Sequence, residues 1–296
     1  MDTAATIGFA DAVLDALPDA TAVLDEAGTI VAVNHAWRMF ALDNGGDPAS
    51  TGVGVNYLEV CAHSALVGCT DAAVVAEGIR SVLQGQTVHS ELEYPCPSPA
   101  AGRWFLLRIN PVGSPVHGAV ASHVNITRRV RAEQDLAHKA AHDPLTGLAN
   151  RTMFHERLTG ELSAWVGRSA EPDIGVLFLD LDGFKPVNDA YGHDAGDEVL
   201  LATSHRLREQ VRAMDTVARL GGDEFGIVSP GITATGLANL ARRITSALAQ
   251  PHFVHGNAVL VSVSVGTYLA HRGEAADEAV RRADAAMYAV KRDRKA

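Results

Sequence analysis

The sequence predicts a mixed α/β chain (α+β) with two domains joined by a helix. At 296 residues, the chain is long enough for two hydrophobic cores. Residues 8–127 read as two strands, short helices and three further strands, whereas residues 142–296 alternate helices with strands. Residues 128–141 contain neither glycine nor proline and are rich in helix formers. We therefore expect two domains and a helical linker.

The composition describes a globular chain and disfavours two classes of partner. Hydrophobic residues make up 47% of the sequence, charged residues make up 20%, and the formal net charge is −10. This charge argues against broad nucleic-acid binding and against adhesion to anionic membranes. No apolar run is long enough to span a bilayer, and the N-terminus lacks a basic signal region. We expect no nucleic-acid partner and no direct membrane insertion.

Cysteine usage favours a reducing compartment. The chain has three cysteines, an odd number without metal-ligand spacing: Cys61, Cys69 and Cys96. Without a secretory signal, this pattern indicates reduced thiols rather than a disulfide framework. The expected location is the cytoplasm.

The first domain begins with a short amphipathic helix over Asp11–Leu17, which Pro18 ends. Two strands follow at Thr21–Asp25 and Gly28–Asn34, with a turn at Glu26-Ala27-Gly28. Later helical patterns cover His35–Leu42 and Asp71–Leu83, and patterns that alternate like strands cover Val88–Tyr94, Trp104–Ile109 and Gly118–Ile126.

This order of elements resembles a PAS domain. The resemblance rests on Leu17-Pro18-Asp19-Ala20 before the first strand, on Val33-Asn34 followed by Trp37 and Phe40, and on the ending Val124–Arg129. It implies a sensor domain, but the sequence leaves its ligand unknown. Tyr57 stands where light-sensing relatives carry a reactive cysteine, which disfavours flavin photochemistry. Haem is left open by three candidate histidines: His63, His89 and His123.

In the second domain, an apolar strand ends in a carboxylate beside an acidic hairpin. Val176–Asp180 reads as a buried strand, and Ala218–Val228 reads as two short strands joined at a Gly-Gly turn. The hairpin would hold acids at a rigid tip. Beside it, the strand-end aspartate makes a hard-oxygen pocket suited to a divalent cation, most naturally Mg²⁺ holding phosphates. The other expected elements are helices at Asn150–Ala164, within Ala195–Met214, at Ala234–Ala249 and at Glu274–Val290, and a strand at Ala258–Leu269.

Four motifs in this domain closely resemble the GGDEF family, the diguanylate cyclases. They are Asp143–Arg151, Asp180–Glu198, the pentapeptide Gly221–Phe225 and Ala283–Lys291. The resemblance covers about residues 142–296. It implies a ferredoxin-like βαββαβ core and a reaction that joins two GTP molecules into cyclic di-GMP and releases two pyrophosphates.

The resemblance also assigns the catalytic positions. It implies Asp180, the backbone carbonyl of Leu181 and Asp223 as ligands of Mg²⁺ or Mn²⁺. Asp223 is also the family's position for proton acceptance, and Glu224 could share either role. Lys185 follows the metal strand, where its ammonium could meet developing phosphate charge.

Other positions match residues that hold the nucleotide. Asp197 matches the family's guanine-reading carboxylate, which accepts from N1–H and the N2 amine; the alternative is an ordinary acid at a helix N-terminus. Asn188 can donate to and accept from the same base, and His193 is a plausible substrate contact. Lys291 matches a phosphate-contacting lysine. Lys295 replaces the usual phosphate-binding arginine and supplies charge without a bidentate fork.

A further pair matches the family's site of product inhibition. Arg212 and Asp215 form an R-x-x-D pair shortly before Gly221. The arginine can donate to O6 and N7 of guanine, and the aspartate can accept from N1 and N2. Arg243 falls where a secondary arginine often contributes, although Arg242 is adjacent. The alternative is a helical i,i+3 ion pair.

The product contains two nucleotides, whereas one site of this family binds one GTP, so the resemblance implies a homodimer. The linker carries an approximate apolar seam of Ile126, Val130, Leu136 and Ala140, which is too short to establish a coiled coil alone. In PAS-linked enzymes of this type, the corresponding helix usually pairs with its copy. The alternative is a rigid monomeric spacer.

Three other functions compete with the cyclase reading. A catalytically weak GGDEF-type receptor for cyclic di-GMP or GTP is disfavoured because both the pentapeptide acids and Asp180 are present. A hybrid GMP–AMP cyclase is disfavoured because Asp197 suits guanine. A phosphodiesterase would need a second catalytic domain, and none follows Ala296.

Overall fold

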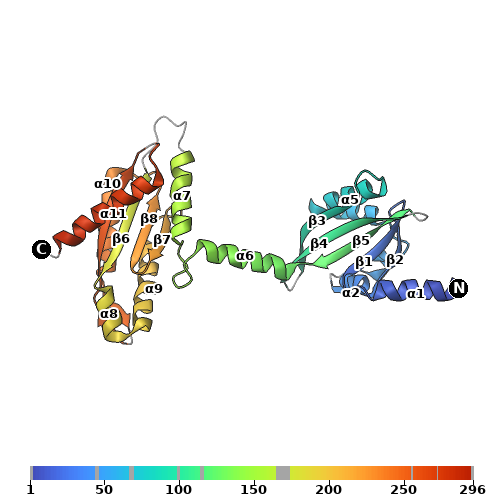
Figure 1. Ribbon diagram of the computed structural model, residues 1–296, viewed down its shortest axis with the longest axis horizontal. Helices are drawn as coiled ribbons and strands as arrows, with labels where there is room; N and C mark the ends of the chain where they lie inside the picture. Colours follow the sequence, from blue (N-terminus) through green and yellow to red (C-terminus); the bar gives the residue numbers. More distant parts are fainter. Residues whose placement is uncertain are drawn as a thin grey trace. The chain divides into compact units, whose positions relative to one another are not determined.

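A computed structural model describes residues 3–43, 47–66, 70–98, 101–113, 117–164, 174–254, 256–271 and 273–294. The chain divides into two units, residues 1–134 and 135–296, each with its own core (Figure 1). Nothing in the described part of the chain is a helix both long and apolar enough to cross a membrane.

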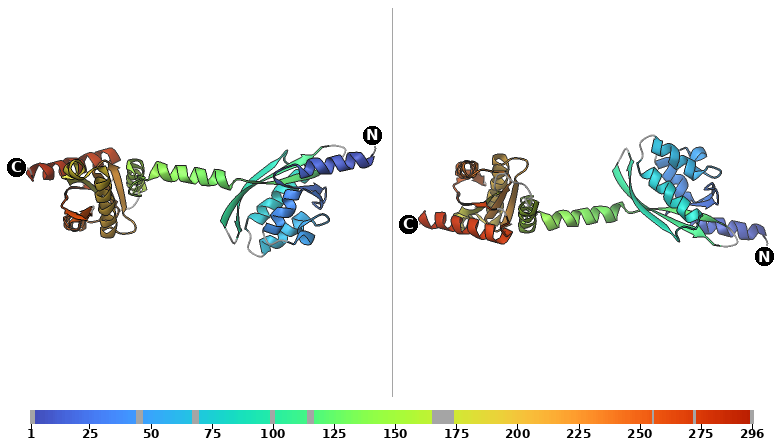
Figure 2. Two further views of the ribbon diagram at one scale, coloured as in Figure 1. Left: turned by 90° about the horizontal axis from the view of Figure 1, so that it is seen from below. Right: turned by 90° about the horizontal axis from the view of Figure 1, so that it is seen from above.

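The first unit is built on a five-stranded antiparallel sheet in the order β2-β1-β5-β4-β3. The strands are β1 (Ala20–Asp25), β2 (Ile30–Val33), β3 (Ser90–Ser98), β4 (Ala101–Val112) and β5 (Gly118–Asn125). The helices are α1 (Thr3–Asp15), α2 (His35–Asp43), α3 (Pro48–Thr51), α4 (Tyr57–Leu66) and α5 (Thr70–Leu83). Helices α2 to α5 gather on one face of the sheet (Figure 2). The core lies between them and includes Leu24, Ile79 and Leu107.

Asn34 fixes the start of this unit. Its buried Oδ1 accepts from the backbone N–H of Thr21 at 2.9 Å and of Trp37 at 2.8 Å. Its Nδ2 donates to the carbonyls of Leu17 and Asp19. One side chain thus caps α2 and ties it to β1.

Helix α4 is an element that the sequence analysis did not predict. Its ten residues show no strong apolar period, and only Cys61 is buried among them. The helix starts where Asn56 Oδ1 accepts from the backbone N–H of Glu59 at 3.2 Å. A cap rather than a periodic pattern therefore marks this helix.

The second unit is built on a four-stranded sheet in the order β11-β6-β8-β7, with every neighbouring pair antiparallel. The strands are β6 (Ile174–Asp182), β7 (Thr216–Gly221), β8 (Glu224–Ser229) and β11 (Ser262–Ala270). The helices are α7 (Arg151–Ala164), α8 (Phe184–Tyr191), α9 (His193–Gln210), α10 (Ala234–Leu248) and α11 (Ala276–Asp293). This succession confirms the predicted ferredoxin-like βαββαβ core.

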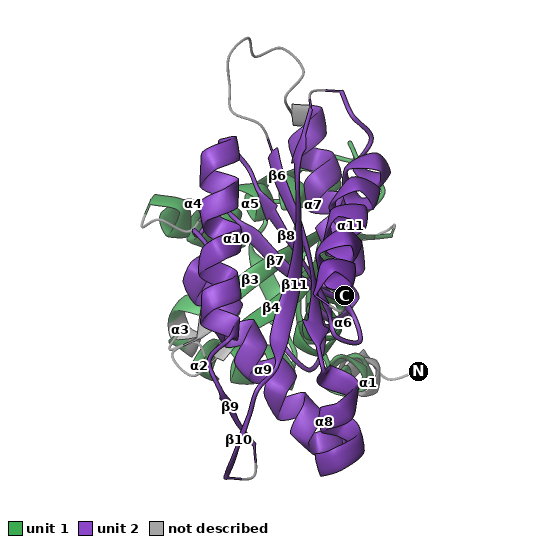
Figure 3. Ribbon diagram, turned by 90° about the vertical axis from the view of Figure 1, so that its left-hand side faces the viewer, with its two compact units in different colours: residues 1–134 green, residues 135–296 purple. Residues whose placement is uncertain are grey.

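Two hydrophobic clusters lie on opposite faces of this sheet. Helices α9 and α10 cover one face, and α7 and α11 cover the other (Figure 3). Along β6, Leu177 and Leu179 point into the first cluster, while Val176 and Phe178 point into the second. Burial on both faces explains why β6 reads as an unbroken apolar run.

The single strand predicted over Ala258–Leu269 is wrong. Residues Asn257–Val259 form β10, which pairs with β9 (His252–Val254) in a separate two-stranded sheet. Gly256, with φ of 80°, lets the chain reverse between them. Leu260 and Val261 lie outside both sheets, and β11 begins at Ser262. The apolar alternation continues across this break and conceals it.

Helix α6 (Thr127–Ala141) covers the predicted linker. At its start, Thr127 Oγ1 accepts from the backbone N–H of Trp104 at 3.0 Å. At its end, the Ala141 carbonyl accepts from the backbone N–H of Asn150 at 2.9 Å. Of the predicted seam, Ile126 and Val130 are buried, whereas Leu136 is 68% exposed.

Candidate active site

Asp180 lies near the end of β6, which is one of the two inner strands of the second sheet. Strand β6 pairs with β8 on one side and β11 on the other, so Asp180 stands opposite Glu224 and Ser264. The six residues of β6 before Asp180 are buried, and Asp180 itself is partly exposed. The apolar strand therefore carries a carboxylate to the surface at a fixed position.

The β7–β8 hairpin places its acids beside this strand end. Gly222 and Asp223 form the turn between the paired residues Gly221 and Glu224, and the φ values of Gly221 and Gly222, 149° and 52°, favour glycine. The backbone N–H of Leu181 donates to the Asp223 carbonyl at 3.2 Å. This bond fixes the tip of the hairpin against β6, next to Asp180.

The ion pair of Arg219 with Asp143 holds the turn in place through a hydrogen bond to the backbone of Gly222. Arg219 Nε donates to the Gly222 carbonyl at 3.0 Å, and its Nη1 lies 3.2 Å from both carboxylate oxygens of Asp143. Burial alone would raise the pKa of Asp143, but bonds from Thr146 and the charge of Arg219 lower it below its usual value. Asp143 therefore stays ionised and holds Arg219 under the turn.

The acids at the tip repel one another. Partial burial, followed by the charge of Asp180, raises the pKa of Asp223, which Lys291 and Arg219 only partly offset. Partial burial likewise raises the pKa of Glu224, with Asp180 and Asp223 adding to the shift and Arg151 opposing it. Extra positive charge would relieve this repulsion.

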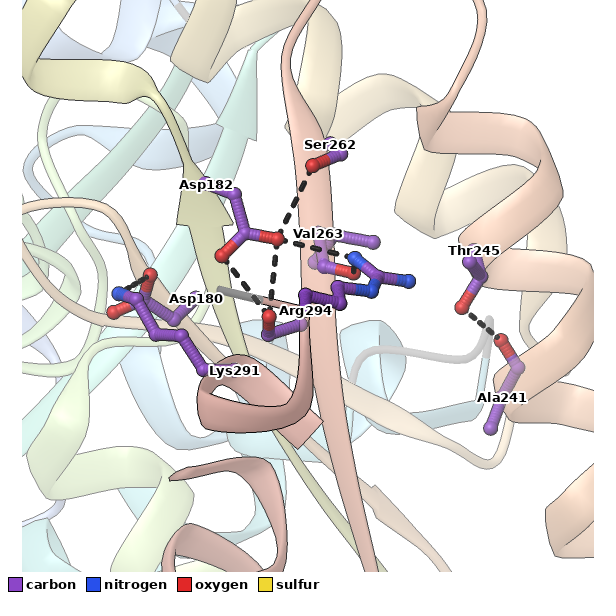
Figure 4. A network of polar contacts seen from close by, with 9 residues as sticks. Asp180, Asp182, Ala241, Thr245, Ser262, Val263, Lys291 and Arg294 are labelled. Carbon is purple, nitrogen blue, oxygen red and sulfur yellow. Dashed lines mark hydrogen bonds and ion pairs between the residues drawn. The ribbon is translucent and has the colours of Figure 1, made fainter. Parts of the chain in front are cut away.

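Lys291 of α11 supplies one positive charge. Its Nζ forms an ion pair with Asp180 (Figure 4). Burial lowers the pKa of Lys291, but the hydrogen bond and charge of Asp180 outweigh it, so the net shift is upward. The matched motifs thus place Asp180, Leu181, Asp223, Glu224 and Lys291 together.

A second network lies two residues further along β6. The carboxylate of Asp182 accepts from Ser264 Oγ at 2.9 Å, Ser262 Oγ at 3.1 Å and Arg294 Nη1 at 3.1 Å. Arg294 Nη1 also donates to the Val263 carbonyl at 2.7 Å (Figure 4). The end of α11 is therefore attached to both β6 and β11.

Sequence reasoning missed Arg294, as well as Arg151, which donates to Glu224 Oε2 at 3.2 Å and to the Leu220 carbonyl. Arg294 follows Lys291 by three residues and so shares its helix face. Arg151 ends the first quoted motif. These two signals were available. Lys295, the residue singled out instead, lies outside the described residues.

The predicted nucleotide contacts stand on α8 and the start of α9. Lys185, His193 and Asp197 are exposed. Asn188 Oδ1 is buried and has no hydrogen-bond partner within the described chain. It lies against Gly196, where an added Cβ would come within 1.9 Å of it. Glycine at this position therefore allows α8 and α9 to approach closely at Asn188.

The predicted product-binding residues line one pocket of about 240 Å³. Arg212, Asp215 and Arg243 contribute to its wall. The side chain of Asp215 is 1% exposed, and its oxygens accept from the Arg212 backbone N–H and from Ser229 Oγ, each at 2.8 Å. The i,i+3 ion pair is long, with Arg212 Nε 3.7 Å from Asp215 Oδ2, and it is not helical because α9 ends at Gln210.

Comparison with known families identifies the class. Residues 140–296 match the model described as diguanylate cyclase, GGDEF domain, and residues 14–131 match the PAS fold model. The chain belongs to the GGDEF family and carries an N-terminal PAS domain, which confirms both predicted resemblances.

Individual relatives match parts of the chain. It is 40% identical over 166 residues to the bifunctional diguanylate cyclase/cyclic di-GMP phosphodiesterase MucR of Pseudomonas aeruginosa, covering 56% of this chain and 24% of MucR. It is 33% identical over 210 residues to diguanylate cyclase TpbB of the same species, covering 70% of this chain and 47% of TpbB. The chain thus spans less than half the length of either relative.

Two solved structures share the fold of the second unit. One is the coiled coil and GGDEF domain of DgcB from Caulobacter crescentus in complex with c-di-GMP, with a TM-score of 0.51 and 29% identity, covering 56% of this chain and 88% of that one. The other is diguanylate cyclase SiaD from P. aeruginosa in complex with its activator SiaC, with a TM-score of 0.50 and 34% identity, covering 56% and 64% respectively.

The site suits a divalent cation, which diguanylate cyclases of this family generally use. Asp180 and Asp223 offer hard carboxylate oxygens, and the charge of Asp180 helps to raise the pKa of Asp223. In the described ranges, no three His, Cys, Asp or Glu side chains gather to hold a metal by themselves. Two carboxylates completed by backbone and phosphate oxygens match the way proteins commonly bind Mg²⁺.

Proposed function

We propose that this protein is a diguanylate cyclase that condenses two GTP molecules into cyclic di-GMP and two pyrophosphates, under the control of its PAS domain. The observation that carries the proposal is the position of Asp180 beside the hairpin tip that bears Asp223 and Glu224. Incubation with GTP and Mg²⁺, followed by chromatography, tests it. Binding of cyclic di-GMP without any turnover of GTP would instead identify a receptor.

Each residue at the site has a part in the proposed reaction. Asp180, the Leu181 carbonyl and Asp223 would hold Mg²⁺ or Mn²⁺, which neutralises phosphate charge when bound. Either Asp223 or Glu224 accepts the proton of the attacking 3′-hydroxyl. Lys291 forms an ion pair with Asp180, and its ammonium would contact a phosphate of the bound nucleotide.

Nearby residues select and place the nucleotide. Lys185 is the second residue of α8, the helix that follows β6. It brings a second, exposed ammonium to the same end of β6 as Asp180. Asn188 and Asp197 read guanine, the amide by donating and accepting, the carboxylate by accepting from N1–H and N2. His193 opens α9 and contacts the substrate, and Lys295 supplies a further charge. Asn188 supports this assignment because its buried Oδ1 lacks a protein partner in the described chain.

Self-association through α6 should be sensitive to charge at Leu136. Leu136→Lys places an ammonium on the exposed part of the apolar seam, where pairing of two chains would bury it. We expect self-association to weaken about tenfold and specific activity to fall at dilute protein. Analytical ultracentrifugation and a concentration series of GTP turnover measure both.

Asp135→Lys provides the control, because it also adds an ammonium at an exposed position of α6 but on the side of the helix opposite the seam. Forced dimerisation should restore the activity of Leu136→Lys. Equal turnover per chain at every concentration, from a protein shown to be monomeric, would contradict the dimer proposal.

Product inhibition should depend on Arg212. The Arg212 side chain is 51% exposed. The buried carboxylate of Asp215 accepts its hydrogen bonds at 2.8 Å from the Arg212 backbone N–H and from Ser229 Oγ, which Arg212→Ala would keep. Arg212→Ala should therefore leave the loop and initial turnover nearly unchanged. It should remove the slowing that appears as cyclic di-GMP accumulates, because the fork that meets O6 and N7 of guanine is lost.

Progress curves and calorimetry with cyclic di-GMP measure this effect. Arg243→Ala should weaken product binding, whereas Arg242→Ala serves as its control because Arg242 does not line the pocket with Arg212. Identical curves and equal affinities for wild type and Arg212→Ala would make the Arg212–Asp215 pair merely structural.

A further inference from the structure

The PAS unit holds two adjoining cavities, each partly open to the surface. Their volumes are about 300 and 230 Å³. Phe40, Tyr57, Val60 and Ser64 line both, and the buried Trp37 adds a further ring to the first. Cavities of this size accept compounds of one or two rings, since a dry apolar space of roughly 150 Å³ already binds benzene.

Polar groups converge on the second cavity around His123. This histidine is buried, with its Nε2 2.9 Å from the Tyr57 hydroxyl and its Nδ1 2.5 Å from the Tyr94 hydroxyl. A neutral imidazole has one N–H and one acceptor nitrogen, so one tyrosine donates to the ring and the other accepts from it. Exchange of the tautomer exchanges these roles. The Tyr57 hydroxyl can therefore offer a bound molecule either a hydrogen or a lone pair.

This arrangement does not suit haem. Both ring nitrogens of His123 are already hydrogen-bonded, so ligation of iron would break a bond to a buried tyrosine. The other two histidines considered from the sequence, His63 and His89, are exposed. Neither lines the cavities.

The cavities also disfavour charged ligands. Burial lowers the pKa of His123 to about 4 and raises the pKa of Tyr57 well above its usual value, so both are neutral near pH 7. Asp71 of α5 lines the second cavity and would repel an anion. In the first cavity, whose described lining residues include no acid, a cation would lose its hydration without gaining an ion pair. A neutral compound meets neither cost.

We propose that the PAS cavity binds a small, neutral aromatic compound of one or two rings, whose single polar group hydrogen-bonds to the Tyr57 hydroxyl beside His123. Trp37 and Phe40 provide the aromatic walls: the Phe40 ring stacks on His123 with centroids 5.5 Å apart, and the Trp37 ring lies edge-on to Tyr57 at 5.5 Å. The inference concerns the PAS unit alone. Its test measures binding, so its failure would leave the proposed cyclase reaction untouched.

Three probes of nearly equal shape test the class of ligand. Acetophenone carries a neutral carbonyl, α-methylstyrene replaces that carbonyl with a CH₂ group, and benzoate carries a charge. Calorimetry on the full chain should give acetophenone a Kd of about 0.1–1 mM, with benzoate at least about tenfold weaker. Absence of binding by both neutral probes, or equal binding of benzoate, would overturn the proposal.

Two variants test the position. Tyr57→Phe keeps the ring and removes the hydroxyl, so acetophenone should bind about tenfold more weakly while α-methylstyrene binds as before. Val60→Phe fills both cavities and should abolish binding of both probes, whereas Val74→Phe, on an exposed position of α5, should not. Equal binding by the two Val→Phe variants would place the ligand elsewhere. Equal loss of both probes in Tyr57→Phe would remove the hydrogen bond from the proposal.

Discussion

Replacing Asp223 with alanine should lower the formation of cyclic di-GMP by at least about a thousandfold. The carboxylate stands at the hairpin tip next to Asp180, where it would bind the cation and lie near the attacking hydroxyl. The fold should persist, because Asp223 is only partly buried and its backbone carbonyl still accepts from Leu181. Turnover with Mg²⁺ and circular dichroism measure the two effects.

The control for this prediction is Glu209→Ala, which removes an exposed acid of α9 that has no part in the site. Asp223→Asn refines it by keeping the shape while removing the charge. Removal of divalent ions with a chelator should reproduce the loss in wild type. A folded Asp223→Ala protein with ordinary turnover would refute the proposed mechanism.

The PAS unit should lose stability as the pH falls, because His123 is buried in its neutral form. Burial lowers the folded-state pKa of His123 to about 4, whereas an unfolded histidine titrates near about 6.5. Between these two values the unfolded chain binds more protons, so acid favours unfolding. From about pH 7.5 to about pH 5, we expect His123 to cost about 2 kcal/mol of unfolding free energy.

His123→Gln should flatten this dependence, because the amide can still donate to one tyrosine and accept from the other without titrating. Urea unfolding at both pH values, followed for both proteins, gives the difference. His252 also has a pKa lowered to about 4, by burial and then by Arg206, but it contributes equally in wild type and variant. The same pH dependence in both proteins would show that His123 does not cause it.

The sequence predicted the acids of the site more fully than the residues that hold them. Asp180 and Asp223 follow from a strand ending and a turn, which are local patterns. Arg219 meets Asp143 across 76 positions of sequence, and Arg294 meets Asp182 across 112. The bridge between Ala149 and Ala218 brings the first pair together, and the packing of α11 against β6 and β11 brings the second, so no single stretch of sequence records either contact.

Elements were predicted best where burial repeats with a regular period. The apolar run of β6 and the amphipathic α10 both appear as expected. Helix α8 was missed: it spans eight residues between Gly183 and Gly192, whose φ values are 83° and 87°. So few residues give too little periodicity to recognise. The β9–β10 hairpin was missed because apolar alternation runs through its end.

The attachment of Arg294 changes where this domain should be cut for expression. The hydrogen bonds from Arg294 to Asp182 and to the Val263 carbonyl hold the end of α11 against β6 and β11. A truncation at Asp293 would remove Arg294 and release the last turn of α11, the helix that carries Lys291. Asp182, the partner of Arg294, is only two strand positions from Asp180. Recombinant versions therefore need to extend past Arg294, and affinity tags are safer at the N-terminus.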